Sequence, residues 1–139
     1  MKKAFIILIA VLAFIVLAAI VGGVVVFVWT GPAKKVAVDF IDDVRQGKIN
    51  EALILTTQKF QNEYKDAIQQ FYDEQGDLVS QIVKININNV SILNDSAEAS
   101  GYVEDDEGTI VPVSVKMVKE QGQWRVYNFV FDFGAAAKK

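Results

Sequence analysis

The hydrophobic pattern divides the chain into two unequal parts. Residues 4–29 form one continuous apolar run without a charged side chain, and a pair of lysines stands on each side of it. As a helix this run would be about 39 Å long, whereas the hydrocarbon core of a membrane is only about 30 Å thick. The pattern therefore predicts a transmembrane helix over residues 4–29 that ends at Gly31 and Pro32.

A cleaved signal peptide is the alternative for this segment. Val16-Leu17-Ala18 could be read as a cleavage site, but cutting there would leave an apolar stretch up to Trp29 at the start of the mature chain. We expect a retained anchor over residues 1–32, bound to the lipid bilayer. The positive charges on the two sides of the apolar run are nearly equal, so they do not determine its orientation. Because the tail before the run is too short to form a domain, we expect the amino terminus inside and the domain extracytoplasmic.

Small residues within the apolar run leave a homodimer open. Ala18 and Gly22 are four residues apart, as are Ala19 and Gly23. Such spacings allow two membrane helices to approach closely, although they are also common by chance in segments rich in Ala and Gly.

After Pro32 the apolar residues recur at helical spacing. Three helices are predicted. The first carries Val36, Phe40, Ile41 and Val44 and ends at Gly47; the second is capped by Asn50 and runs through Leu55; the third carries Phe60, Tyr64, Ile68 and Phe71 and stops near Gly76.

From Ile82 onward the pattern changes to the alternation of β-strands. The apolar positions of the first strand move from odd to even numbers after Ile87, which predicts a bulge near Asn88 and Asn89. Three further strands are expected at Ala97–Glu104, Thr109–Lys119 and Gln123–Phe133, the last two joined by a hairpin turn at Glu120–Gln123.

Two of these strands carry unusual residues. Pro112 would interrupt a central ladder, so an edge position or a bulge is expected there. The last strand is apolar at both even and odd positions, which predicts a strand covered on both sides. Its apolar residues are Trp124, Val126 and Val130 on one face and Tyr127, Phe129, Phe131 and Phe133 on the other.

Composition argues against several classes of function without identifying one. The chain has no cysteine and no histidine, so it offers no zinc ligands of those types and no catalytic arrangement built on them. From Val36 onward 17 acidic residues stand against 10 basic ones, a formal charge of −7 that disfavours nucleic acid. The acids at Glu104–Glu107 lack the ligand spacing of a calcium loop. We expect no metal and no cofactor.

Helices followed by an antiparallel meander define an α+β domain, and two stretches give it a resemblance. AKKVAVDFIDDVRQGKINEALILTT, residues 33–57, resembles the opening of NTF2-like (cystatin-like) domains. EQGQWRVYNF, residues 120–129, is similar to the closing hairpin of small extracytoplasmic members such as the DUF4878-type families. The resemblance implies a cone over residues 33–133, with three helices packed on a curved four-stranded sheet, and leaves 134–139 as a tail.

The same resemblance points to candidate site residues. NTF2-like enzymes similar to ketosteroid isomerase use an acidic base with a tyrosine or a protonated acid as hydrogen-bond donor. Asp132, in an otherwise apolar strand, and Tyr64 are the residues of this chain that could take such roles, with solvation of Asp132 at the strand end as the alternative.

Three classes of function remain after these exclusions. We expect a membrane-anchored binding or interaction module without catalytic activity, whose partner is a protein or a small apolar ligand. A scaffold subunit of a cell-envelope or secretion assembly is the first alternative, because such subunits resemble one span followed by an NTF2-like domain. A small isomerase or hydrolase using the cone is the second.

Overall fold

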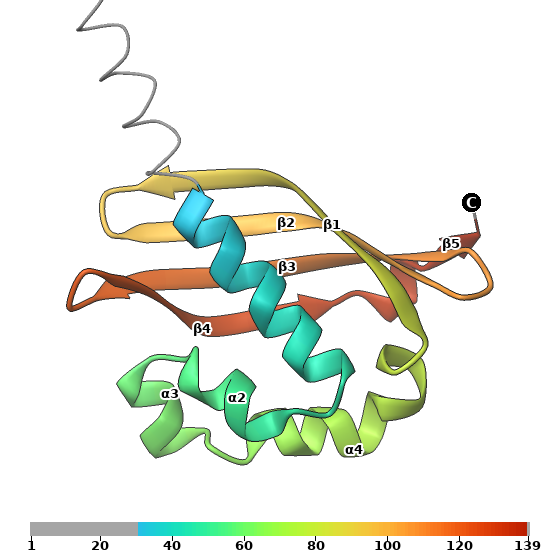
Figure 1. The fold of residues 1–139 in the computed structure, drawn as a ribbon, viewed down its shortest axis with the longest axis horizontal. Coiled ribbons are helices and arrows are strands. Elements are labelled where there is room, and N and C mark those ends of the chain that lie inside the picture. Colours follow the sequence, from blue (N-terminus) through green and yellow to red (C-terminus); the bar gives the residue numbers. More distant parts are fainter. Residues whose placement is uncertain (1–30, 139) are drawn as a thin grey trace, which may run out of the picture. The chain divides into compact units, whose positions relative to one another are not determined.

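The α-helices precede the strands in the described part of the chain. The computed structural model describes residues 31–138. A helix over residues 31–45 comes first (Figure 1). It is followed by α2 (Ile49–Ile54), α3 (Gln58–Glu63), α4 (Ala67–Val79), β1 (Ile82–Leu93), β2 (Ser96–Asp105), β3 (Thr109–Glu120), β4 (Gln123–Phe131), the 3₁₀ helix η1 (Phe133–Ala135) and β5 (Ala137–Lys138). This is the α+β order that the sequence predicts.

The predicted anchor lies almost entirely outside the described residues, on positions 1–30. Gly31 and Pro32, where we expected the apolar segment to end, already lie in helix 31–45. Within residues 31–138 no helix is long and apolar enough to cross a bilayer.

The strands form one antiparallel meander in the order β1-β2-β3-β4. The two-residue β5 also pairs with β3, at Thr109 and Ile110, so the sheet has five strands where four were predicted. The sheet curls, and β1 bends down towards α4 at one end, which produces the cone (Figure 1).

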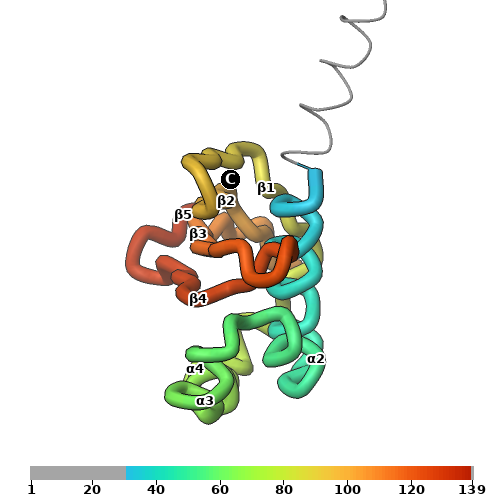
Figure 2. Tube along the Cα trace, turned by 90° about the vertical axis from the view of Figure 1, so that its left-hand side faces the viewer, coloured from blue at the N-terminus to red at the C-terminus, as the bar shows by residue number. Residues whose placement is uncertain are grey.

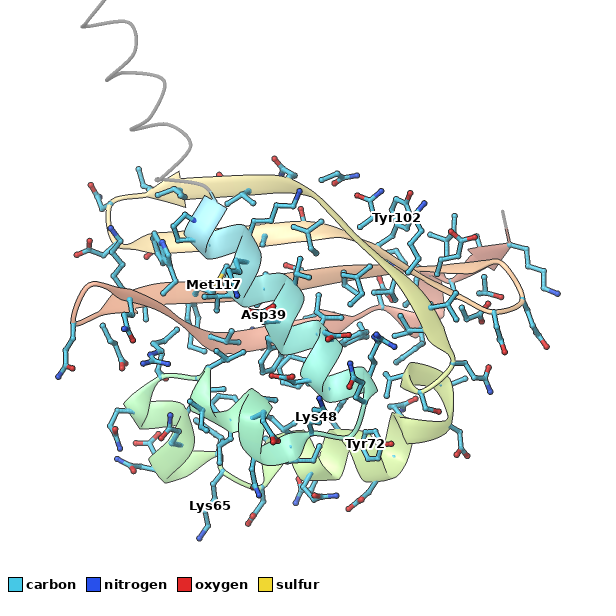
Figure 3. All side chains as sticks on the ribbon, in the orientation of Figure 1. Asp39, Lys48, Lys65, Tyr72, Tyr102 and Met117 are labelled. Carbon is cyan, nitrogen blue, oxygen red and sulfur yellow. The ribbon has the colours of Figure 1, made fainter. Side chains whose placement is uncertain are left out.

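Helix 31–45 crosses one face of this sheet, as the edge view in Figure 2 also shows. Phe40, Ile41 and Val44 are fully buried on its inner side, and Met117 of β3 is buried where the helix crosses the sheet (Figure 3). On the other face of β3, Pro112 and Lys116 are exposed. The alternation of buried and exposed residues thus places the core on the concave side of the sheet.

Gly47 ends helix 31–45, as predicted. Its φ of 72° is left-handed, and the N–H groups of Gly47 and Lys48 donate to the carbonyl oxygens of Val44 and Asp43. This pair of hydrogen bonds is the Schellman arrangement, for which glycine is favoured. Tyr72 of α4 lies against Gly47 (Figure 3): a Cβ built there would be 3.0 Å from its hydroxyl.

The predicted second and third helices need correction. The second begins at Ile49 after Lys48, so Asn50 lies inside α2 and is not its cap. The third is two helices, because Tyr64 leaves helical geometry at φ −130°, ψ 28°. The chain then restarts as α4, which runs past Gly76 to Val79. The break allows Phe60 and Ile68 both to be buried while Tyr64 is 55% exposed.

A bulge in β4 corrects the prediction that this strand is covered on both sides. Lys116 pairs with Asn128 and Met117 with Val126, so Tyr127 has no partner on β3. Trp124 and Val126 face the core before this residue, and Phe131 faces it afterwards. One extra residue therefore brings even and odd positions to the same face. Tyr127 and Val130 are exposed instead.

The bulge predicted in β1 is confirmed, since the register with β2 shifts between Ile87 and Asn89. A second shift lies between Ile82 and Lys84. Ile82 is consequently buried, whereas Val83, the first of the odd-numbered apolar residues expected on the inner face, is 66% exposed.

Pro112 lies in a central strand and without a bulge, but at a point where the pairing of β3 with β4 has ended, so that side of β3 is locally an edge. Pro112 pairs with Tyr102 of β2 in unbroken register. The last β3–β4 pair is Val113 with Phe131, and the Pro112 carbonyl accepts a hydrogen bond from the N–H of Asp132 just beyond β4. Because β4 has already ended, no ladder partner there requires the N–H that proline lacks.

Candidate functional site

Aromatic side chains pack together where helix 31–45, α4 and β4 meet. Phe129 of β4 lies 5.1 Å from Phe40 of helix 31–45 and 5.2 Å from Phe71 of α4, measured between ring centroids. Phe71 is also 5.2 Å from Phe131, and Phe131 stacks on Phe133 at 6.1 Å. These separations are typical of favourable aromatic packing. The five rings join helix, sheet and η1 into one apolar core.

Within residues 31–138 the buried polar side chains are two threonines. The Thr56 hydroxyl donates to the Leu53 carbonyl oxygen, and the Thr57 hydroxyl accepts the N–H of Phe60. Both belong to a connection that covers the outer edge of β4, where the N–H of Thr57 donates to Val126 O and the N–H of Val126 donates to Leu55 O. Their hydrogen bonds hold the fold together rather than leaving a reactive group in the cone.

Asp132 lies at the end of β4 and is exposed. Its side chain accepts a hydrogen bond from the N–H of Ala135 and so caps η1. Its position is that of the alternative we considered, a solvated residue where the strand ends.

Tyr64 is also largely exposed and stands apart from Asp132. It closes α3, and its ring lies 6.0 Å from that of Phe60. α3 begins beside the β3–β4 turn, where the N–H of Gln58 donates to Glu120, whereas Asp132 follows the opposite end of β4. The structure does not bring the two candidate residues together.

A small apolar pocket opens at one end of the cone. Its volume is about 150 Å³. It lies among the ends of α4, β1, β2 and β3 and is closed by η1. Its lining consists of Leu78, Ile82, Val103, Asp105, Thr109, Val111, Phe133 and Ala136. We call this the cone-end pocket.

The one acid in this lining has a structural role. Asp105 Oδ1 accepts the N–H groups of Glu107 and Thr109, at 2.9 and 2.8 Å, and so fixes the β2–β3 turn. The pocket therefore offers mainly an apolar environment. Across residues 31–138 no group of acidic side chains is arranged to hold a metal ion.

A second, larger concavity lies at the other end of β3. It has a volume of about 570 Å³ and separates the β3–β4 turn from the corner between α2 and α3. Arg125 and Glu120 are its charged residues. From the sequence, Arg125 was visible only as the basic residue of the closing hairpin, because the α2–α3 corner opposite it is remote in the chain.

One carboxyl outside both concavities is perturbed. Burial raises the pKa of Asp43, and the negative charge of Asp42 adds to this effect, while Lys48 acts in the opposite direction. Asp43 lies near the end of helix 31–45 among other acids, so partial burial together with repulsion from these acids accounts for the raised pKa.

Comparison with solved structures defines the class of fold. A Campylobacter jejuni protein, provisionally named an NTF2-like transpeptidase, superimposes with a TM-score of 0.58 at 18% identity, over 68% of this chain and 95% of its own. A five-substitution variant of the designed protein Rd1NTF2_05 gives a TM-score of 0.53 at 14% identity, over 71% of this chain and 95% of its own. The domain therefore has an NTF2-like fold.

Comparison of the sequence with family models and curated proteins finds no relative. No family model matches the chain, and no curated protein matches it. At 14–18% identity the two structural matches establish the fold alone, and an NTF2-like fold hosts many unrelated functions.

Proposed function

We propose that this protein is a membrane-anchored, extracytoplasmic NTF2-like module that binds a partner or a small apolar ligand and does not catalyse a reaction. The aromatic packing between helix and sheet is the observation that supports the proposal. Phe129 packs against Phe40 and Phe71, whereas the resemblance implies that an NTF2-like enzyme would hold its substrate inside the cone. General acid–base catalysis needs a titratable group positioned at the substrate, and the candidate Asp132 is on the surface.

The cone-end pocket is where we place the apolar ligand. About 150 Å³ is the volume of an engineered apolar cavity that binds benzene, and it is below the ~300 Å³ at which drug-sized ligands begin to fit. The pocket therefore suits one ring or the end of one alkyl chain. Such a group could belong to a free molecule or to the side chain of a partner protein.

A methyl NMR titration of the full chain in lipid nanodiscs tests this assignment, with benzene as the probe. Saturable shifts are expected for the methyl groups of Ile82, Val103 and Val111, which line the pocket, but not for Val115, which is buried elsewhere in the core. Uniform shifts, or none at the lining residues, would contradict the proposal.

Two alanine substitutions provide a matched pair for the same titration. Ala136 lines the pocket and Ala135 does not, although both are exposed. Ala136→Phe is expected to fill the pocket and abolish the benzene-dependent shifts, whereas Ala135→Phe should leave them unchanged. Equal effects of the two variants would remove the support for a ligand at this position.

A further inference from the structure

The larger concavity, between the β3–β4 turn and the α2–α3 corner, contains a cation fixed in place. Arg125 Nη1 donates to the Ile54 carbonyl oxygen at 2.7 Å, and Nη2 donates to Gln123 Oε1 at 2.6 Å. Both acceptors are neutral. The guanidinium is therefore held in one orientation without having its charge cancelled, and three of its five N–H donors are not used by these two bonds.

The other arginine in the described part of the chain shows the contrast. Arg45 forms an ion pair with Asp42 at 2.6 Å. Among the described residues, Lys35 and Arg45 each form an ion pair with an aspartate, whereas no carboxylate of residues 31–138 lies within ion-pair distance of Arg125. A domain with more acids than bases thus leaves an oriented arginine without an acidic partner, at the side of a groove of about 570 Å³.

The rest of the lining presents groups that suit a peptide backbone. The side-chain amide of Gln61 is fixed because its Nε2 donates to the carbonyl oxygens of Leu53 and Thr56. Glu120 Oε2 accepts the N–H of Gln58, which leaves its second oxygen open to a further donor. Amide and carboxylate oxygens can accept hydrogen bonds from peptide N–H groups. The complete lining is Ile54, Thr56, Gln58, Gln61, Glu120, Gln121 and Arg125.

An exposed apolar side chain completes the groove. Ile54, at the end of α2, is 64% exposed, and its own carbonyl oxygen accepts the hydrogen bond from Arg125. A segment whose carboxylate meets Arg125 could cover this side chain with an apolar residue. The combination of one oriented cation, hydrogen-bond acceptors and one apolar contact matches an extended peptide better than a purely apolar ligand.

We propose that this groove binds an extended peptide segment of a partner protein, with a peptide carboxylate paired to the Arg125 guanidinium. Arg favours such pairs because its planar fork can donate two parallel hydrogen bonds to one carboxylate. The carboxylate is either a chain terminus or an Asp or Glu side chain. The proposal goes beyond the cone-end pocket, which lies at the opposite end of β3, and it does not depend on a ligand there.

Three short peptides test the proposal with the full chain in nanodiscs, observed through backbone amide signals. The first is N-acetyl-Ala-Leu-Ala with a free carboxylate, the second is the same peptide amidated, and the third is amidated N-acetyl-Ala-Leu-Asp. At least one carboxylate peptide is expected to shift the amides of Ile54, Gln121 and Arg125 with a Kd of roughly 1 mM. The amidated neutral peptide should bind at least tenfold more weakly.

The comparison of the peptides identifies the source of the carboxylate. Binding by the first peptide alone assigns a chain terminus, and equal or better binding by the third assigns an acidic side chain. Absence of groove shifts with both carboxylate peptides would overturn the proposal, as would equal binding of the neutral one. The benzene shifts in the cone-end pocket report separately, so failure here is distinguishable from failure of the proposed function.

Substitutions of Ile54 test the charge requirement without disturbing Arg125, whose removal would also release the end of α2. Ile54→Asp is expected to weaken binding of the carboxylate peptide at least tenfold by repulsion. Ile54→Lys loses the same apolar contact but adds a positive charge, so it should bind this peptide at least tenfold more tightly than Ile54→Asp does. Val83→Asp, at a similarly exposed apolar site on β1, should have no effect on binding. If Ile54→Asp binds as well as the unchanged chain, Arg125 is not the anchor.

Discussion

Single residues decide how closely the strands approach, and Gly101 is the sharpest case. A Cβ at this position would lie 1.9 Å from the carbonyl oxygen of Asn86 and 2.9 Å from the Cα of Ile87. Both atoms belong to the backbone of β1 at its bulge, so they cannot rotate away as a side-chain end could. The bulge that the sequence predicted in β1 thus requires a glycine on β2, a requirement that the sequence alone did not reveal.

Gly101→Ala is expected to destabilise the domain by about 1–3 kcal/mol, the range for inserting a group into a filled space. Ser100→Ala on the same strand is the control and should change stability by less than about 0.5 kcal/mol. Urea unfolding followed by tryptophan fluorescence measures both. Equal stability of Gly101→Ala and the unchanged chain would mean that β1 and β2 are farther apart there than the structure shows.

Asp43 makes the stability of the domain depend on pH. Its pKa is raised in the folded chain by burial and by Asp42, so the folded state holds this proton to higher pH than the unfolded state does. Ionised Asp43 therefore disfavours folding at neutral pH, and the penalty disappears as the pH falls through the raised pKa. Asp43→Asn should stabilise the domain at pH 7 by less than about 1 kcal/mol, as is usual for partly exposed charges.

The gain from Asp43→Asn should vanish below the ordinary carboxyl pKa of about 3.9, where Asp43 is protonated in both states. Asp42→Asn is the matched control, because it removes the ion pair with Arg45 and should not stabilise. Urea midpoints measured across pH 3–7 check both variants. A constant effect of Asp43→Asn over this range would argue against a role for the carboxyl charge.

At the scale of elements, type and order could be predicted from the sequence, but breaks within elements could not. Periodicity identified the strands and most helical segments, because one face of each is apolar. The residue that breaks an element follows no such pattern. Tyr64 sits at helical spacing between Phe60 and Ile68, yet it ends α3 and is exposed.

The candidate site shows the same limit. Apolar residues at both even and odd positions of β4 were interpreted as two covered faces, whereas the bulge at Tyr127 brings Val126 and Phe131 to one face. Asp132 then follows at the surface. The apolar neighbours that singled it out in the sequence come from a strand that has already ended, and burial of a residue near a bulge depends on register.

Substitutions of Thr57 test how much the cap of the short helix α3 stabilises the domain. Its hydroxyl caps α3 by accepting the N–H of Phe60 at 3.1 Å, and Thr57 is buried. Thr57→Ala is expected to cost about 0.5–2 kcal/mol, whereas Thr57→Ser keeps the oxygen and should retain most of the stability. Thermal unfolding of the two variants measures the difference. Equal losses would show that the methyl group, rather than the cap, carries the effect.

At the scale of the whole molecule, the cone-end pocket and the groove beside Arg125 differ in the chemical character of their linings. The cone-end pocket is apolar and small, and the groove at the other end of β3 is polar and carries an oriented arginine. The buried core lies between the two concavities, so the two proposed contacts would be made at separate ends of the domain. This arrangement is consistent with a binding module, in which function depends on what the surfaces meet.

The position of the domain relative to the membrane is the last prediction. The apolar run over residues 4–29 continues past Ala18, so we expect it to stay as an anchor with the domain outside the cytoplasm. Protease added to spheroplasts should then digest the domain while cytoplasmic proteins remain intact, and mass spectrometry of the purified chain should find residues 1–18 still attached. A cytoplasmic protein of similar size is the control for leakage. Full protection of the domain would contradict the proposed topology, because a domain inside the cytoplasm could not meet extracytoplasmic partners. A mature chain starting near Ala19 would contradict it as well, because a released domain would not be held at the membrane.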